Sequence, residues 1–271
     1  MRRKHLILST LLVATLVTGL FALTFMSRAV GANKSLEPTA TLTIHDNEST
    51  YTYLPLNLHI VPPAPVPTDK LLNPGFEEGF THDTFDGSWV YNILTPKDWV
   101  TWWEDEPSSV QYPMHSPEVR PIPNLGIYYS PIPRIHSGHY AIQMMRSWGR
   151  YRAGFYQQVE DVSPGSIAHF SYYAHAWSCG DDPPPALSCG DPYAFYFQAG
   201  IDPTGGTDPW SGYVIWSAPQ YIYDVYDLVG PVAVEVGAEG KVTVYTLAYG
   251  RYAVKYNEAY FDDAVLAIQQ P

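Results

Sequence analysis

The sequence predicts an all-β fold, an antiparallel β-sandwich of the jelly-roll type, and three observations support this. Tyr, Trp and Phe make up 15% of the residues, and Gly and Pro together contribute 45 of 271. Aromatic residues favour strands, whereas Gly and Pro mark turns. Lys, Glu and Leu, which favour helices, dominate no long window. Short β-rich segments follow one another without the crossover helices that a parallel α/β sheet needs.

Eight strands are expected in the folded part of the chain. Their predicted ranges are 140–145, 153–162, 169–177, 193–201, 212–216, 232–236, 241–249 and 260–268. Side chains alternate between the two faces of a strand. One face of the segment 169–177 is therefore apolar and is expected to point into the core, with Phe170, Tyr172, Ala174 and Ala176 on it.

The N-terminus predicts export. Arg2, Arg3 and Lys4 precede an apolar run over residues 6–26, and small residues follow at 30–32. This order is typical of a secretory signal peptide. The run also reaches the ~20 residues that a membrane span needs, so an uncleaved anchor is the alternative. Both interpretations place the rest of the chain outside the cell or at its surface, with a membrane touched only through this segment.

Composition divides the chain into three parts. Residues 1–32 form the signal peptide or anchor, residues 33–69 a Pro/Thr-rich linker, and residues 70–271 the folded domain. Prolines favour an extended, semi-rigid spacer. Residues 51–61 alternate enough to form a strand, which could instead dock on the domain.

The net charge argues against one class of partner. Residues 1–32 hold four basic side chains and no acidic one, so the remainder carries 11 basic and 27 acidic residues, a formal net charge of −16. Nucleic acids and anionic membrane surfaces are polyanions and are not expected to bind it. The spare carboxylates suit either solubility or a hard cation such as calcium.

Two cysteines lie ten residues apart in a proline-containing loop. In an oxidising compartment, Cys179 and Cys189 are expected to form a disulfide that closes this loop. A metal-binding pair is the alternative, although no histidine lies beside them at ligand spacing.

Four short motifs occur in order along residues 71–268. They are NPGFEEG at 73–79, SGHYA at 137–141, YQQV at 156–159 before a Pro-Gly turn at 164–165, and YFDDAVL at 260–266. The ordered set resembles carbohydrate-binding modules of families four, nine and twenty-two, which have the galactose-binding-like jelly roll. The segments 200–210, 214–219 and 253–266 resemble a variant found in exported proteins of filamentous bacteria. That resemblance implies the fold and names no ligand.

The resemblance also implies a structural calcium ion between the first and last strands. Carried over to this sequence, Glu77 and Asp262 would supply carboxylates, and backbone carbonyls near Ser137 and His139 would complete the ligand shell. Calcium takes six to eight oxygen ligands.

Strand periodicity gives an independent argument for a buried acid. Asp262, Ala264 and Leu266 alternate onto one face, with Asp263 on the other. If Ala264 and Leu266 face the core, Asp262 is carried inward and needs a partner. The alternative to calcium is that Asp262 accepts backbone amides or pairs with a cationic side chain, and a shift of one residue would exchange the two aspartates.

A glycan is the expected ligand. Sugar rings present apolar C–H faces that stack on exposed aromatic rings, and amide groups take the hydroxyls. The alternative is that these aromatics are buried, with their polar ends satisfied. The candidate ligand contacts are Trp148, Tyr151, Gln157, Tyr173, Trp177 and Trp210.

No catalytic centre is predicted. The acidic run 104–106 follows a tryptophan pair, as in some glycosidase sites, but it is more simply a solvated loop. Metalloprotease, serine-hydrolase and phosphate-loop motifs do not occur. The sequence thus predicts an exported, non-catalytic binding module, calcium-stabilised and glycan-binding. The alternative is a cell-envelope or adhesion protein that uses the sandwich for protein contacts. The oligomeric state is left open.

Overall fold

A computed structural model describes residues 39–40, 43–46, 49–52, 56–57, 68–85, 88–123, 134–182 and 186–270. The chain divides into two compact units, Met1–Ala64 and Pro65–Pro271. The predicted signal peptide or anchor at 1–32 lies outside the described residues. Within the described part of the chain, no helix is long and apolar enough to cross a membrane.

The first unit contains two short antiparallel pairs within the predicted linker. Strand β1 (Thr39–Ala40) pairs with β4 (Leu56–Asn57), and β2 (Thr43–Asp46) pairs with β3 (Ser49–Thr52). The expected strand over 51–61 is thus represented by parts of β3 and β4. Strand β5 (Thr68–Asp69), at the end of the predicted linker, belongs to the second unit and pairs with β17.

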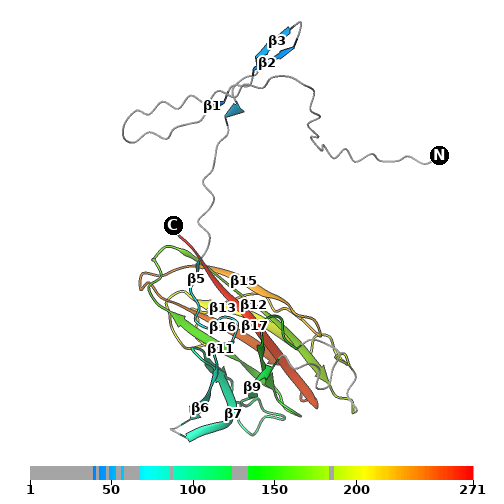
Figure 1. Ribbon diagram of the computed structural model, residues 1–271. Helices are drawn as coiled ribbons and strands as arrows, with labels where there is room; N and C mark the ends of the chain where they lie inside the picture. The colour runs from blue at the N-terminus through cyan, green and yellow to red at the C-terminus, as the bar shows by residue number, and fades with distance from the viewer. Residues whose placement is uncertain are drawn as a thin grey trace, which may run out of the picture. The chain divides into compact units, whose positions relative to one another are not determined.

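The second unit is a β-sandwich of two sheets (Figure 1). The larger sheet has the order β15 (Asp227–Glu235), β12 (Ile167–Cys179), β17 (Tyr256–Gln269), β10 (Tyr140–Met145), β9 (Glu118–Pro123), β7 (Ser88–Pro96) and β6 (Phe80–Phe85), with β5 beside β17. The smaller sheet has the order β14 (Ile215–Trp216), β13 (Phe195–Asp202), β16 (Val242–Gly250), β11 (Tyr151–Val159) and β8 (Val100–Trp103). All the pairs are antiparallel except β7 with β9. The predicted all-β sandwich is confirmed.

Aromatic side chains join the two sheets. Phe261 of β17 is fully buried, and its ring lies 5.5 Å from that of Phe155 and 5.9 Å from that of Phe197, both in the smaller sheet. The predicted inward face of 169–177 is confirmed, since its four members are fully buried: Phe170, Tyr172, Ala174 and Ala176.

The eight predicted strands correspond to β10–β17, with ends that differ by up to five residues. Strands β6–β9, over residues 80–123, were not predicted. Prolines interrupt this region, and β9 itself has the sequence EVRPIP. Proline within an apolar run argues against a strand because it lacks an N–H group for the ladder.

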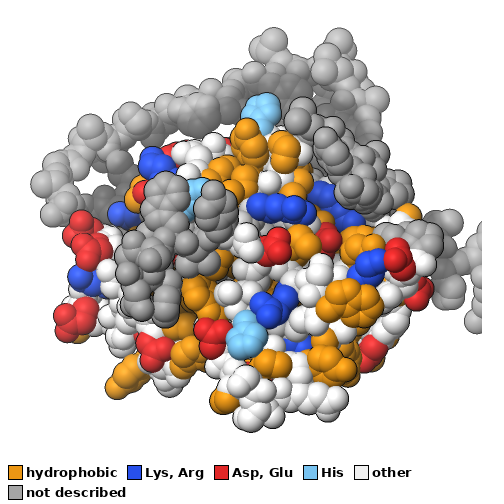
Figure 2. Space-filling model, turned by 90° about the horizontal axis from the view of Figure 1, so that it is seen from below, with side chains coloured by type: hydrophobic (Ala, Val, Ile, Leu, Met, Phe, Trp, Pro, Cys, Tyr) orange, Lys and Arg blue, Asp and Glu red, His pale blue; other side chains and the backbone are white. Residues whose placement is uncertain are grey.

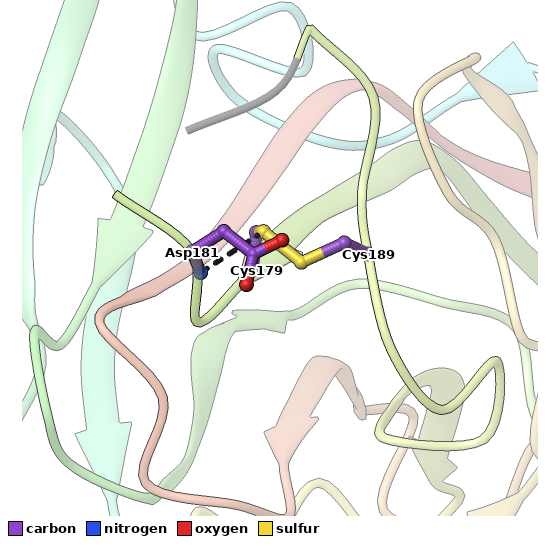
Figure 3. Close-up of side chains that lie close together, drawn as sticks. All are labelled: Cys179, Asp181 and Cys189. Carbon is purple, nitrogen blue, oxygen red and sulfur yellow. Dashed lines mark hydrogen bonds between the residues drawn. A yellow bond between two sulfur atoms is a disulfide. The ribbon is translucent and has the colours of Figure 1, made fainter. Parts of the chain in front are cut away.

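The predicted disulfide is confirmed. Cys179 and Cys189 are bonded, with Cα atoms 4.8 Å apart (Figure 3). The backbone N–H of Asp181 donates to Cys179 Sγ at 3.4 Å. Among the described residues, these three form the one group of Cys, His, Asp or Glu side chains close enough to share a metal. Because the sulfurs are bonded to each other, the metal-binding alternative for the cysteines is wrong.

Candidate functional site

Asp262 is fully buried and accepts backbone hydrogen bonds. Its Oδ2 accepts from the N–H groups of His136 (2.9 Å) and Ser137 (3.1 Å), and its Oδ1 accepts from that of Asp263 (2.9 Å). Burial raises the pKa of Asp262 to about 7, against the lowering effect of the Ser137 amide. This bonding matches the amide-accepting alternative for Asp262.

A bulge places Asp262 on the side of the sheet away from the core, opposite Tyr173. Phe261 and Ala264 both belong to the core, which two-residue alternation alone would not allow. Asp263 takes up the extra residue with a left-handed φ of 43°, and the pairing with β12 shifts register here. Extra residues of this kind re-aim side chains in antiparallel sheets. Asp262 is the buried member of the pair, but the expectation that it points into the core with Ala264 and Leu266 is wrong. It lies on the opposite face of the sheet, covered by the backbone of residues 136–137.

Glu77 holds the same loop from the other side. Its Oε1 accepts the N–H groups of His139 (2.8 Å) and Tyr140 (3.1 Å). Gly138, between these donors and Ser137, has a φ of 64°. A Cβ atom at Gly138 would lie 2.1 Å from Glu77 Oε1, so a larger residue cannot fit without displacing the carboxylate.

Asp263 completes an acidic clasp, by which we mean Glu77, Asp262 and Asp263 around residues 136–140. Its Oδ2 lies 2.6 Å from His136 Nδ1, and its Oδ1 accepts the Ser137 hydroxyl at 2.9 Å. The predicted calcium residues are thus brought together. Their carboxylate oxygens are hard donors of the kind that calcium takes, but the bonds made here are to N–H and O–H groups.

Three of the predicted ligand contacts are buried and cannot reach a ligand. The Tyr151 hydroxyl donates to the Met144 carbonyl at 3.1 Å inside the core. Gln157 bonds the backbone of residue 72 through both its oxygen and its nitrogen. Trp177 is also buried. The alternative of burial therefore holds for Tyr151 and Trp177. The pattern of a single strand does not say which of its outward positions are covered by loops.

The remaining three candidates differ in position. Tyr173 stacks on His136, with ring centroids 3.8 Å apart, and so supports the loop of the acidic clasp. Trp148 and Trp210 are exposed, by 63% and 46%. Trp210 contacts the edge of Trp102 at 5.4 Å, and the Arg152 guanidinium lies 4.8 Å over its ring.

Trp210 belongs to a larger aromatic surface on the outer side of the smaller sheet. Along β16, Val242, Val244 and Ala248 face the core, whereas Tyr245 and Leu247 belong to a second apolar cluster on the opposite side. This surface, the aromatic face, has members from all five strands of the sheet and from the turn before β14. They are Trp102, Tyr156, Tyr196, Trp210, Trp216, Tyr245, Leu247 and Tyr249.

Ring contacts connect the aromatic face. Trp216 lies 6.2 Å from Trp102 and 5.9 Å from Tyr245, and Tyr245 lies 5.7 Å from Tyr156. A Cβ atom at Gly200 would lie 2.7 Å from the Trp216 ring, so this glycine lets the indole lie against the sheet. A second run joins Tyr249, Tyr196, Tyr221 and Tyr193 through contacts of 5.2, 6.0 and 5.0 Å.

Two arginine–glutamate pairs border the aromatic face. Arg150 lies 3.5 Å from Glu106, and Arg152 lies 3.5 Å from Glu104. Among the described residues, three buried polar atoms here have no hydrogen-bond partner: Trp102 Nε1, Arg150 Nε and Arg152 Nε. Buried polar atoms are normally satisfied. Enclosed atoms of this kind are open to a bridging water and not to direct contact with a ligand.

Sequence reasoning missed most of this face. The segment 242–249 is apolar on both faces, a pattern that indicates a strand covered on both sides. The spacings Glu104-x-Glu106 and Arg150-x-Arg152 place each pair on one side of an extended segment. These signals were available, but the pairing of the segments was not.

Other surface features lie apart from the aromatic face. A pocket of about 300 Å³ lies against β7, β9 and β10, and its lining includes Asn92, Glu118 and Met145 but no member of the aromatic face. Hydrophobic side chains remain exposed among basic and acidic ones on the surface seen from below (Figure 2). The pocket is small and mixed in character, whereas the aromatic face is connected.

Comparison with known proteins gives only distant structural likenesses. No family model matches the chain, and no curated protein matches it. Among solved structures, the chain is similar to TmCBM61 in complex with β-1,4-galactotriose, with 13% identity over 73% of this chain and 97% of that one and a TM-score of 0.43. It is also similar to a Stig cyclase from Fischerella sp. TAU, with 13% identity, 76% and 98% coverage and a TM-score of 0.46. A family 16 carbohydrate-binding module gives 10% identity, 51% and 86% coverage and a TM-score of 0.31. Likenesses at this level do not assign a ligand or an activity, and the fold assignment rests on the sheets themselves.

Proposed function

We propose that this protein is an exported, non-catalytic module that binds a glycan or polysaccharide on the aromatic face. The observation that carries the proposal is a connected set of aromatic rings on an outer sheet surface, bordered by two arginine–glutamate pairs. Trp102 and Tyr245 are buried members that support this surface. The members open to a ligand are Trp210, which is exposed, and the partly exposed Tyr156, Tyr196, Trp216 and Tyr249. Sugar C–H faces stack on such rings, and charged side chains take the hydroxyls. Trp210, with its exposed ring, is the principal anchor.

The environment of the nearby acids supports binding over catalysis. Glu104 and Glu106 are each paired with an arginine. Asp105 accepts from Trp103 Nε1 at 2.8 Å and lies 3.1 Å from His115 Nδ1. A general acid must be free to give a proton to the substrate, whereas these three carboxylates are engaged by arginine, indole and imidazole groups.

Export is proposed from the N-terminal segment and the disulfide together. The basic residues and apolar run at 1–32 have the order of a signal peptide or anchor. Disulfides such as Cys179–Cys189 form and persist in oxidising compartments. The protein then acts outside the cell or at its surface.

Calcium stabilisation is a second part of the proposal. The carboxylates of the acidic clasp now accept N–H and O–H groups and do not converge on one point. They would have to turn toward the ion together with the backbone carbonyls near Ser137 and His139, and its charge would offset theirs. Thermal melts of the protein in calcium and in EGTA test this directly. A ligand that binds only the folded state raises the melting temperature, so equal melting temperatures at millimolar calcium would reject it.

Binding to a panel of soluble polysaccharides tests the main proposal. Trp210→Ala should weaken binding to the polysaccharide of this panel that the wild type binds by roughly tenfold or more, the usual effect of removing an aromatic anchor. Val265→Ala, an exposed apolar residue of the other sheet, is the control and should bind normally. If no glycan binds at millimolar sugar, the alternative is favoured, in which the sandwich makes protein contacts in the cell envelope or in adhesion.

A further inference from the structure

Two exposed aromatic residues adopt a backbone conformation that is unfavourable for them. Tyr112 and Trp148 have φ values of 56° and 55° and are 60% and 63% exposed. The left-handed region is disfavoured for residues with a Cβ atom and especially for bulky ones. Neither ring gains enough burial to offset this strain.

The other described non-glycine residues with a left-handed φ have an evident explanation. Five are asparagine or aspartate, whose short polar side chains tolerate this region: Asn73, Asp98, Asp161, Asp224 and Asp263. Phe76 is fully buried, with its ring 5.4 Å from Trp99, so packing offsets its strain. Strain held without such an offset is found at functional sites.

The two strained residues lie on neighbouring loops. A parallel bridge joins Met114 to Arg150, and each aromatic residue lies two positions before its bridged residue. Arg150 Nη1 also donates to the Tyr112 carbonyl at 3.3 Å. The Trp148 N–H donates to the Val254 carbonyl at 2.8 Å. The strained backbone of both residues is therefore fixed by hydrogen bonds to neighbouring segments.

A buried amide adds a third aromatic residue to the group. Asn257 Nδ2 donates to the carbonyls of Gly149 and Tyr252, at 3.0 Å each. This ties the loop of Trp148 to the loop of Tyr252, whose ring is 46% exposed. We call Tyr112, Trp148 and Tyr252 the loop-end aromatics.

Arg150 joins the loop-end aromatics to the aromatic face. Its Nη2 donates to the hydroxyl of Tyr249, a member of that face, at 3.2 Å. Its Nε is buried and has no hydrogen-bond partner within the part of the chain that the structure describes. The full chain carries a formal net charge of −12, which disfavours an anionic membrane or nucleic acid as the occupant. A neutral polyhydroxylated chain suits the exposed rings.

We propose that the loop-end aromatics form a second subsite, contiguous with the aromatic face, that stacks on further sugar rings of the same polysaccharide chain. This rests on the proposed function. The left-handed conformation of Tyr112 and Trp148 serves ligand contact and not stability. Long oligosaccharides occupy both surfaces, whereas short ones occupy the aromatic face alone.

The first arm of the test measures stability. Asparagine accepts the left-handed conformation, so Tyr112→Asn and Trp148→Asn should keep or raise the melting temperature, by up to a few degrees. Tyr213→Asn is the control, since Tyr213 is equally exposed but its φ is not left-handed, and it should give no rise. A melting temperature lowered by several degrees in Trp148→Asn would mean that the ring supports the fold, and would overturn the proposal.

The second arm measures the affinity of the protein for short and long oligomers of the polysaccharide that the wild type binds. Trp148→Asn should weaken the long oligomer at least fivefold and leave the short one unchanged, whereas Trp210→Ala should weaken both. If only Trp210→Ala weakens binding, the second subsite is wrong and the proposed function stands. If the wild type retains no polysaccharide, or if Trp210→Ala binds normally, the proposed function itself is wrong.

Discussion

Gly138→Ala should disrupt the acidic clasp through a single added methyl group. The Cβ atom would meet Glu77 Oε1 at 2.1 Å and its Cδ at 2.9 Å, so the carboxylate must move away from the His139 and Tyr140 amides. The backbone strain of alanine at a φ of 64° adds about 1–2 kcal/mol. Two weakened hydrogen bonds to an exposed carboxylate add about 1–2 kcal/mol more.

The chain offers a matched control. Gly165 has a φ of 78°, but a Cβ atom there would meet nothing within 4 Å. Gly165→Ala should therefore lose stability only through the backbone strain of alanine at a left-handed φ. For a domain of this size each kcal/mol lowers the melting temperature by about 2–4 °C. We expect a fall of about 3–6 °C for Gly165→Ala and about 6–12 °C for Gly138→Ala.

Differential scanning calorimetry in EGTA measures both variants without a contribution from calcium. In a Glu77→Ala background there is no carboxylate to displace. Gly138→Ala should then lower the melting temperature no more than Gly165→Ala does. Equal losses for the two glycines in the wild-type background would refute the steric argument. If Gly138→Ala lowers the melting temperature as much in the Glu77→Ala background as in the wild type, the loop needs glycine for another reason.

Three further outcomes follow from the core, the disulfide and a buried carboxyl. Phe261→Ala removes the ring that joins the sheets and should cost about 3–5 kcal/mol in a denaturant titration, where a loss under 1 kcal/mol would contradict the packing described. Replacing Cys179 and Cys189 by alanine should cost about 3 kcal/mol for a loop of 10 residues, and an unchanged melting temperature would exclude that estimate. Burial raises the pKa of Glu258 above its ordinary value of 4.5, so its contribution to stability is present below that value and is lost as pH rises through the raised pKa. Unfolding free energies from pH 4 to 8 should fall more for the wild type than for Glu258→Gln, and parallel curves would contradict this.

Much of the sandwich could be predicted because the residue pattern within each of its main strands already indicates a strand and its buried face. In β12 the inward residues alternate without interruption, so one segment was enough to assign its core face. Strands β6–β9 lack this property: β9 contains Pro121 and Pro123, and β7 joins it in parallel. Their pairing depends on segments far away in the chain, which local pattern cannot supply.

The candidate site was only partly predictable for the same reason. Tyr156 and Tyr245 meet because β11 pairs with β16, and Arg152 lies opposite Tyr249 in the same ladder. No single segment contains this information. Tyr151 and Arg152 are adjacent in sequence, yet the first fills the core and the second borders the aromatic face. A one-residue difference in register separates a core residue from one at the border of the aromatic face.

The aromatic face has buried members that support the fold, such as Tyr245 and Leu247, and members that keep part of their surface exposed. The core between the sheets is closed by fully buried rings such as Phe155, Phe197 and Phe261, none of which belongs to the aromatic face. Trp210 and Trp216 contact that face and keep part of their rings exposed, so their loss leaves the core intact. Substitutions there should reduce ligand affinity with little change in melting temperature, whereas substitutions in the core should do the reverse. A variant of Trp210 that unfolded the domain would mean that the aromatic face is a second core and not a binding surface.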